Sequence, residues 1–272
     1  MYALPLRRLY AMAFGAMFAI ALPSFAATGT GAVKSPTSKL YVVEAVGQAT
    51  ITAGDKIEPI STKSVYDANA SIIETDAEST GAFVLSNGTG LFCAANSRLE
   101  IRRFVQEPFL PNRTDLEVEP SVSQTSVFVG SGSCSFCTSR LVAGSVMTYV
   151  TPLAAINVRG GKMVVEVKDR QTKVSLFEGD ITLRGGDYDE AGQVLKAGQQ
   201  AIIVPGEPGK ANPITVQPIP EAEAPLADEQ ATTACMARRT VYFDTGDQGE
   251  IIATPITPAE IPSDYTISPA RL

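Results

Sequence analysis

The sequence predicts an all-β protein. Valine, isoleucine, threonine and glycine dominate residues 40–204, turn residues recur at short intervals, and no run of ten residues beyond the N-terminal apolar segment keeps a helical period. The phrase Leu-x-x-Gly, followed by a β-prone run, occurs three times, from Leu141, Leu176 and Leu195. Each copy predicts that a strand ends, the glycine turns the chain and the next strand begins at once. Because the spacing is uneven, a degenerate repeat and ordinary hairpins with shared turn chemistry both remain open.

Residues 1–26 predict a secretory signal peptide that is cleaved after Ala26. Arg7 and Arg8 precede a short apolar run, and small residues stand before the cleavage point. The run is shorter than the roughly 20 apolar residues that a membrane span needs, so an uncleaved anchor is the less favoured alternative. Cleavage changes the net charge from −7 to −9, which argues against nucleic acid and anionic membranes as partners. The expected location is therefore periplasmic or secreted, with no membrane span after cleavage.

Residues 27–39 predict a disordered leader, and residues 40–204 predict the β domain. Within that domain, alternating apolar and polar residues and an Asn87-Gly88 turn predict the first strands. These strands are expected at 41–52, 71–75, 82–85, 91–93 and 99–101.

Pro108 and Pro111 interrupt strand pairing between residues 106 and 112 and predict a loop there. A short strand around Leu116 and Val118 is expected to present an acidic, solvated face, and residues 129–134 a Gly/Ser/Cys hinge. Beyond residue 204, regularly spaced prolines predict a linker and tail over 205–272, with one short element near 232–243.

The chain has no histidine and no tryptophan. A Ser-His-Asp or Cys-His nucleophile and a His-ligated zinc are therefore excluded. Asp187, Asp189 and Glu190 lie in a Gly-rich stretch, where acidic residues commonly serve turn chemistry rather than a glycosidase reaction. We therefore expect no catalytic residue, no cofactor and no metal site, and the chain is not expected to be an enzyme.

Four cysteines are the disulfide candidates: Cys93, Cys134, Cys137 and Cys235. An even number behind a secretion signal predicts disulfides, with three pairings open. Cys134 and Cys137 have the spacing of a redox CxxC motif, but no helical pattern follows them, so structural bonding is the favoured interpretation.

An ordered series of short motifs between residues 42 and 204 resembles the FecR domain family. The motifs are Val46-Gly47-Gln-Ala-Thr-Ile51, Ile73-Glu-Thr75, Gly81-Ala-Phe-Val-Leu-Ser-Asn87-Gly88-Thr89, Asn96-Ser97-Arg-Leu-Glu-Ile101, Thr151-Pro152-Leu-Ala-Ala-Ile-Asn-Val158-Arg159-Gly160, Val174-Ser-Leu-Phe-Glu178-Gly179 and Ala197-Gly198-Gln199. The resemblance implies a periplasmic β-solenoid-like or stacked β-sheet domain. Familiar members are transmembrane regulators that sense an outer-membrane iron–siderophore receptor and control a sigma factor through a Trp-containing cytoplasmic tail. This chain departs from them by its signal peptide and by its lack of tryptophan and of such a tail. It also has Gly161 where threonine is usual and, by comparison with the family pattern, an insert over residues 106–139.

These observations lead to three functional hypotheses. The first is a non-catalytic binding or scaffold module that engages a cell-envelope protein or polysaccharide, with Arg159 as the possible partner contact or, alternatively, an ordinary surface arginine. The second is a component of an envelope signalling pathway of the sigma-regulator or iron-uptake type. The third is a glycan- or matrix-binding β-solenoid, which requires exposed aromatic rows. Its available tyrosines are Tyr41, Tyr66, Tyr149 and Tyr188.

Overall fold

The computed structural model describes residues 38–109, 116–246 and 250–256. All of them belong to the unit Lys34–Leu272, which is described here by itself. The predicted signal peptide, most of the predicted leader and the part of the predicted tail beyond residue 256 lie outside the described residues.

The described residues form nineteen strands and one helix. In chain order they are β1 Lys39–Val46, β2 Ala49–Ala53, β3 Lys56–Pro59, β4 Val65–Asp67, β5 Ser71–Thr75, β6 Thr80–Leu85, β7 Gly90–Cys93, β8 Arg98–Gln106, β9 Ser123–Thr138, β10 Val146–Val150, β11 Ala155–Val158, β12 Gly161–Lys168, β13 Gln171–Glu178, β14 Asp180–Arg184, β15 Gln193–Lys196, β16 Gln199–Ile203, β17 Ile214–Pro218, α1 Ala224–Ala237, β18 Val241–Thr245 and β19 Ile251–Pro255. The all-β class predicted from the sequence is confirmed.

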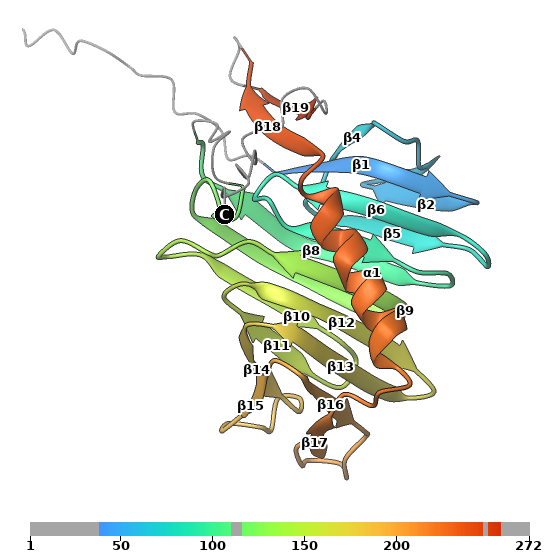
Figure 1. Cartoon of the computed structure of the whole chain (residues 1–272), viewed down its shortest axis with the longest axis vertical. Coiled ribbons are helices and arrows are strands. Elements are labelled where there is room, and N and C mark those ends of the chain that lie inside the picture. Colours follow the sequence, from blue (N-terminus) through green and yellow to red (C-terminus); the bar gives the residue numbers. More distant parts are fainter. Residues whose placement is uncertain (1–37, 110–115, 247–249, 257–272) are drawn as a thin grey trace, which may run out of the picture. The chain divides into compact units, whose positions relative to one another are not determined.

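Two large sheets share their middle strand, β9 (Figure 1). Sheet 1 has the order β3-β2-β5-β8-β9-β10-β11-β14-β15. Sheet 2 has the order β4-β1-β6-β7-β9-β12-β13-β16-β17. Neighbouring strands are antiparallel except β9 and β10, which run parallel. The structure therefore has the stacked-sheet form of the predicted fold, because a solenoid would repeat parallel coils.

Strand β9 passes from sheet 1 to sheet 2 at Gly130–Gly132. Ser131 is still paired with Arg98 of β8, whereas Gly132 is already paired with Val167 of β12. Gly132 has a φ of +81°, and a Cβ atom there would lie 2.3 Å from the Ser97 Oγ. Only glycine accepts both the backbone angle and the close approach, so the predicted hinge is the crossing point.

The main core lies between the two sheets. Alternate side chains along β9 point into it, so that Val127 and Val129 are buried in sheet 1 and Phe136 in sheet 2. The Phe136 ring packs against the ring of Tyr149 from sheet 1 at a centroid distance of 4.0 Å. Burial of each large apolar side chain contributes about 1.5–3 kcal/mol, which holds the sheets together.

Helix α1 covers the outer face of sheet 2 (Figure 1). Its buried side is a seam of small residues, Ala231, Ala234 and Ala237. A Cβ atom on Gly90 of β7 would lie 1.9 Å from the Ala234 carbonyl oxygen, so the helix rests directly on the strand backbone. A second, smaller core continues the contact toward the β18–β19 hairpin; it comprises Tyr41, Ala82, Val84, Phe109, Ala237, Val241, Phe243 and Ile251.

The linker and tail predicted over 205–272 were expected to hold one short element near 232–243, but the described residues of this range form β17, α1, β18 and β19. Residues 214–218 pair with β16 as an edge strand, where the flanking prolines are tolerated because one side needs no ladder donor. Pro225 stands in the first turn of α1, where its missing N–H costs nothing. The sequence did not predict helix α1, because its buried residues are alanines, which give only a weak apolar period.

Two further predictions need correction. The expected strand at 41–52 is two strands, because Gly47 at a φ of +75° turns the chain from sheet 2 into sheet 1. The predicted insert at 106–139 contains β9, which is the centre of both sheets. The strand expected around Val118 is a single bridge to Arg140.

The Leu-x-x-Gly phrase does what its residues predict in two of its three copies. In the first copy, Leu141 lies after the end of β9 at Thr138, and β10 begins only at Val146. Gly144, Gly179 and Gly198 have φ values of +96°, +88° and +82°. Strand β14 begins directly after Gly179, and β16 begins directly after Gly198. Gly179 therefore turns the chain from β13 of sheet 2 to β14 of sheet 1, and Gly198 turns it back from β15 of sheet 1 to β16 of sheet 2.

We expect Gly132→Ala to destabilise the protein more than Gly198→Ala. Gly198 has a nearly identical φ of +82° but nothing within 4 Å of its hypothetical Cβ atom, so its substitution costs only the left-handed strain of about 1–2 kcal/mol. Gly132→Ala adds the clash with Ser97 and should cost about 1–3 kcal/mol more. Urea unfolding of the two variants measures this difference, and equal destabilisation would contradict the tight crossing.

Candidate functional site

A charged groove of about 710 Å³ lies beside the C-terminal end of α1. We call it the arginine groove. Its charged lining residues are Glu117, Arg140, Arg159, Lys162, Glu178, Asp180, Arg238 and Arg239. The groove collects these groups from the loop before β9, the end of β9, the β11–β12 and β13–β14 turns, and the helix.

The floor of the groove is built from three glycines. A Cβ atom on Gly161 would lie 2.3 Å from the Glu178 carbonyl oxygen, and one on Gly179 would lie 2.7 Å from the Gly160 carbonyl oxygen. Two chain turns therefore touch backbone to backbone, which leaves the space above them open to the surrounding side chains. The Gly160-Gly161 segment is thus part of a close backbone contact.

A disulfide forms one side of the groove. Cys137 of β9 is bonded to Cys235 of α1, with a Cα–Cα distance of 5.0 Å. Three ways of pairing the four cysteines were open from the sequence, and the structure contains the Cys137–Cys235 bond of one of them. Cys93 and Cys134 are free thiols. The bond fixes the helix to the central strand and so holds this side of the groove in place.

A buried arginine reinforces the same side. The Arg238 side chain donates to the Ser139 Oγ at 3.1 Å and to the Leu116 carbonyl oxygen. Its guanidinium also lies 3.4 Å from the Glu117 carboxylate, which contacts Arg239 at the same distance. These bonds attach the loop before β9 to the end of the helix.

Arg140 and Arg159 are the exposed cations of the groove that have no ion-pair partner among the described residues. Their positions are adjacent, because the Leu141 amide donates to the Arg159 carbonyl oxygen at 3.0 Å. The structure thus places the predicted contact residue Arg159 in a groove, next to a second arginine that the sequence analysis did not select. That neighbour could be found only from the three-dimensional structure, since 19 positions separate the two residues.

The β13–β14 turn adds the opposite charge to the groove. Glu178 and Asp180 flank Gly179 and are both exposed, and neither has an ion-pair partner within the described part of the chain. Lys162, by contrast, is held by α1 through the Asp228 carboxylate at 2.7 Å and the Thr232 hydroxyl at 2.8 Å. Among the described residues, the groove therefore holds two cations without an ion-pair partner, Arg140 and Arg159, and two such anions, Glu178 and Asp180.

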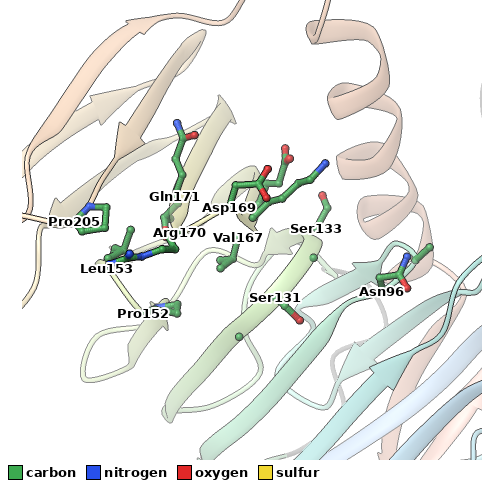
Figure 2. A pocket seen from close by; sticks show the side chains of 16 residues that line it. Asn96, Ser131, Ser133, Pro152, Leu153, Val167, Asp169, Arg170, Gln171 and Pro205 are labelled. Carbon is green, nitrogen blue, oxygen red and sulfur yellow. The ribbon is translucent and has the colours of Figure 1, made fainter.

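A second hollow, of about 770 Å³, lies where β9 changes sheets (Figure 2). Ser131 and Ser133 of β9 line it together with Val167, while Pro152, Leu153 and Pro205 gather at one side and Asn96 lies at the other. Its β12–β13 turn is tight, with φ values of +53° and +60° at Asp169 and Arg170. On β9, the pairing with β10 ends at Phe128 and the pairing with β12 ends at Gly132, so the hollow lies at the gap between the ends of these two strands.

Of the three acidic residues singled out in the Gly-rich stretch, Asp189 has a structural role, whereas Asp187 and Glu190 are exposed. Asp189 accepts backbone N–H bonds from Gly185 at 2.9 Å and from Gly192 at 2.8 Å. These bonds hold the pKa of the Asp189 carboxyl below its usual value. The turn-chemistry interpretation therefore describes this residue correctly.

Glu119, expected on a solvated strand face, is instead buried. It is 2% exposed, and its carboxylate accepts bonds from the Ser123 hydroxyl and, at 3.3 Å, the Val142 amide. Burial raises the pKa of Glu119, although hydrogen bonds from Ser123, Ser145, Val142 and Asn87 oppose that shift. Asp115, the third acidic residue of that stretch, lies outside the described residues.

The described residues contain neither a group of metal ligands nor a membrane-spanning helix. No group of three or more His, Cys, Asp or Glu side chains there is placed to hold a metal ion. The helix of the described region is too short to cross a bilayer.

Comparison with known proteins gave only distant likenesses. No family model and no curated protein matches the chain. Two solved structures that resemble it are each described as a "putative anti-sigma factor" from Parabacteroides distasonis. The first aligns over 56% of this chain and 62% of its own chain, with 16% identity and a TM-score of 0.40. The second aligns over 68% and 99%, with 13% identity and a TM-score of 0.42. A likeness this distant transfers no function to this chain.

We expect Glu119→Gln to change how stability depends on pH. Because folding raises the pKa of Glu119, the folded state binds this proton more tightly, and the stability gained from it is complete below the unfolded pKa of about 4.5. It is lost as the pH rises toward the folded pKa. The free energy of unfolding of the wild type, relative to Glu119→Gln, should therefore fall as the pH rises above about 4.5.

Urea unfolding between pH 4 and pH 8 measures this difference. Glu58→Gln, at an exposed position of β3, is the matched control. A constant difference between wild type and Glu119→Gln would contradict the buried, proton-binding carboxyl.

Proposed function

We propose that this protein is a non-catalytic module of the cell envelope, periplasmic or secreted, that binds a partner protein through the arginine groove. The observation that carries the proposal is the pair Arg140 and Arg159, exposed and adjacent with no ion-pair partner in the described region. Arginine offers a planar set of donors that suits carboxylates, so two such side chains at one groove favour a protein partner with acidic groups.

The construction of the groove supports binding. Its floor is touching backbone, and one side is fixed by the Cys137–Cys235 bond and by the buried Arg238. Little conformational freedom in the scaffold is lost when a partner docks on such a surface, which favours affinity. Glu178 and Asp180 would add specificity, because a partner must present a cation opposite them as well as an anion opposite the arginines.

The disulfide supports the proposed compartment. A disulfide between a strand and a helix persists in an oxidising environment, such as the periplasm or the cell exterior. The signal peptide expected from residues 1–26 is in keeping with the same compartment.

A groove is a better candidate than the sheet edges. The edge strands β3, β4, β15 and β17 are three to five residues long. Pro59 and Pro218 end two of them and remove ladder donors, which is how natural sheets discourage strand addition.

The structure does not favour the glycan-binding alternative. Tyr41 and Tyr149 are buried, and Tyr66 is half-buried. Among the described residues, Tyr188 is the one aromatic side chain that is strongly exposed. A row of aromatic platforms for sugars would need several.

The signalling alternative concerns the partner rather than the groove. A module that resembles FecR domains and binds an envelope receptor or regulator through this surface would act in signalling. A partner from the structural envelope would make it a scaffold. The identity of the bound protein distinguishes the two.

The test is the double charge reversal Arg140→Glu/Arg159→Glu. The full chain, with its leader, is expressed with an affinity tag, and proteins recovered from an envelope extract are quantified by mass spectrometry. We expect the specific partner to be recovered by the wild type and depleted at least about tenfold by the variant, since each lost charge-assisted contact costs on the order of 1–3 kcal/mol.

The matched control is Lys56→Glu/Arg103→Glu, which changes the net charge equally at exposed positions of β3 and β8. This control should retain the partner. Equal recovery by the groove variant and the wild type would refute the proposed binding surface.

A further inference from the structure

Two cysteines that take no part in the groove face each other inside the main core. The Cys93 and Cys134 sulfur atoms lie 3.1 Å apart. The two residues are direct register partners on the antiparallel strands β7 and β9, and both are at most 1% exposed. Their backbones are thus held in position by the ladder, and no strand has to move to bring the sulfur atoms together.

Strand alternation determines which cysteines can meet. Three positions separate Cys134 from Cys137, so their side chains leave β9 on opposite faces. Cys134 points into the core beside Phe136, whereas Cys137 points to α1 and is bonded to Cys235. The CxxC spacing therefore belongs to two separate pairs, one on each face of sheet 2, and the motif does not close on itself.

We propose that Cys93 and Cys134 are the site of a second disulfide, which joins β7 to β9 within the core when the protein matures in an oxidising compartment. The oxidant is a disulfide-bearing molecule, such as oxidised glutathione or a disulfide oxidoreductase. One cysteine thiolate attacks a sulfur of the oxidant and forms a mixed disulfide, which releases one thiolate of the oxidant. The other cysteine thiolate then attacks the protein sulfur of that mixed disulfide and releases the second. Two cysteines are oxidised, one disulfide is reduced to two thiols, and the two protons pass from the cysteines to those thiols.

The bond forms before the core closes. The hydrogen bond to Cys134 and burial both raise the pKa of Cys93, so the attacking thiolate is suppressed once the strands are packed. An oxidant also cannot reach sulfur atoms that are at most 1% exposed. The folded dithiol should therefore react slowly, and a bond made during folding should resist reductants in the native protein.

The direct test maps the disulfides. The full chain is refolded in a mixture of oxidised and reduced glutathione, then denatured in the presence of iodoacetamide and digested with trypsin and chymotrypsin. Chymotrypsin cuts after Phe136, which separates Cys134 from Cys137. We expect one peptide pair joined through Cys93 and Cys134, a second joined through Cys137 and Cys235, and no alkylated cysteine.

Alkylation of Cys93 and Cys134 in a sample that contains the Cys137–Cys235 bond would overturn the proposal. So would a peptide in which Cys134 is joined to any other cysteine. The variant Cys137→Ser/Cys235→Ser is the matched control, because it removes the helix bond and should still yield the Cys93–Cys134 pair.

A second measurement addresses the effect of the bond. The variant Cys93→Ser/Cys134→Ser should melt about 5–15 °C below the oxidised wild type, because the lost cross-link frees the unfolded chain and hydroxyl groups enter an apolar core. Reduction of the wild type in denaturant, followed by refolding under reductant, should lower its melting temperature in the same direction. Equal melting temperatures for the oxidised wild type and this variant would count against the bond.

Discussion

The fold depends on one strand that belongs to two sheets. Strand β9 pairs with β8 and β10 in sheet 1 and with β7 and β12 in sheet 2, so the two sheets meet in one continuous backbone. The crossing requires a residue that adopts a positive φ in close contact with the segment around Ser97, and Gly132 meets that requirement. Hydrophobic burial between the sheets supplies the stabilisation, but the crossing decides which strands become neighbours.

The proposed binding surface is a consequence of the same strand. The end of β9 carries Cys137 and Ser139, which connect α1 to sheet 2 through the disulfide and Arg238. Arg140 follows directly and is exposed next to Arg159. The residues that hold the helix and the residues proposed to bind the partner are therefore successive along one segment, which gives the groove a rigid base.

Strand alternation gives different partners to Cys134 and Cys137, two nearby cysteines of β9. Along β9, the residue that faces the core meets a thiol from β7, and the residue that faces outward meets the helix. A cross-link on each face would fix β9 to its neighbour in the sheet and to the element that covers the sheet. This arrangement suits the proposed location in an oxidising compartment, where disulfides persist and restrict the unfolded chain.

The sequence by itself determined the β class, several hairpins and the glycine turns, because alternation, Asn-Gly pairs and positive φ are local properties of the chain. It also drew attention to Arg159 and to the four cysteines. Only the tertiary structure decided that residues 123–138 are the central strand, that an alanine-rich segment is a covering helix, and that Arg140 lies beside Arg159. The physical reason is that these features arise from contacts between distant segments. A small alanine is buried when a glycine-bearing strand lies beneath it, and a cysteine finds its partner when strand register has been set.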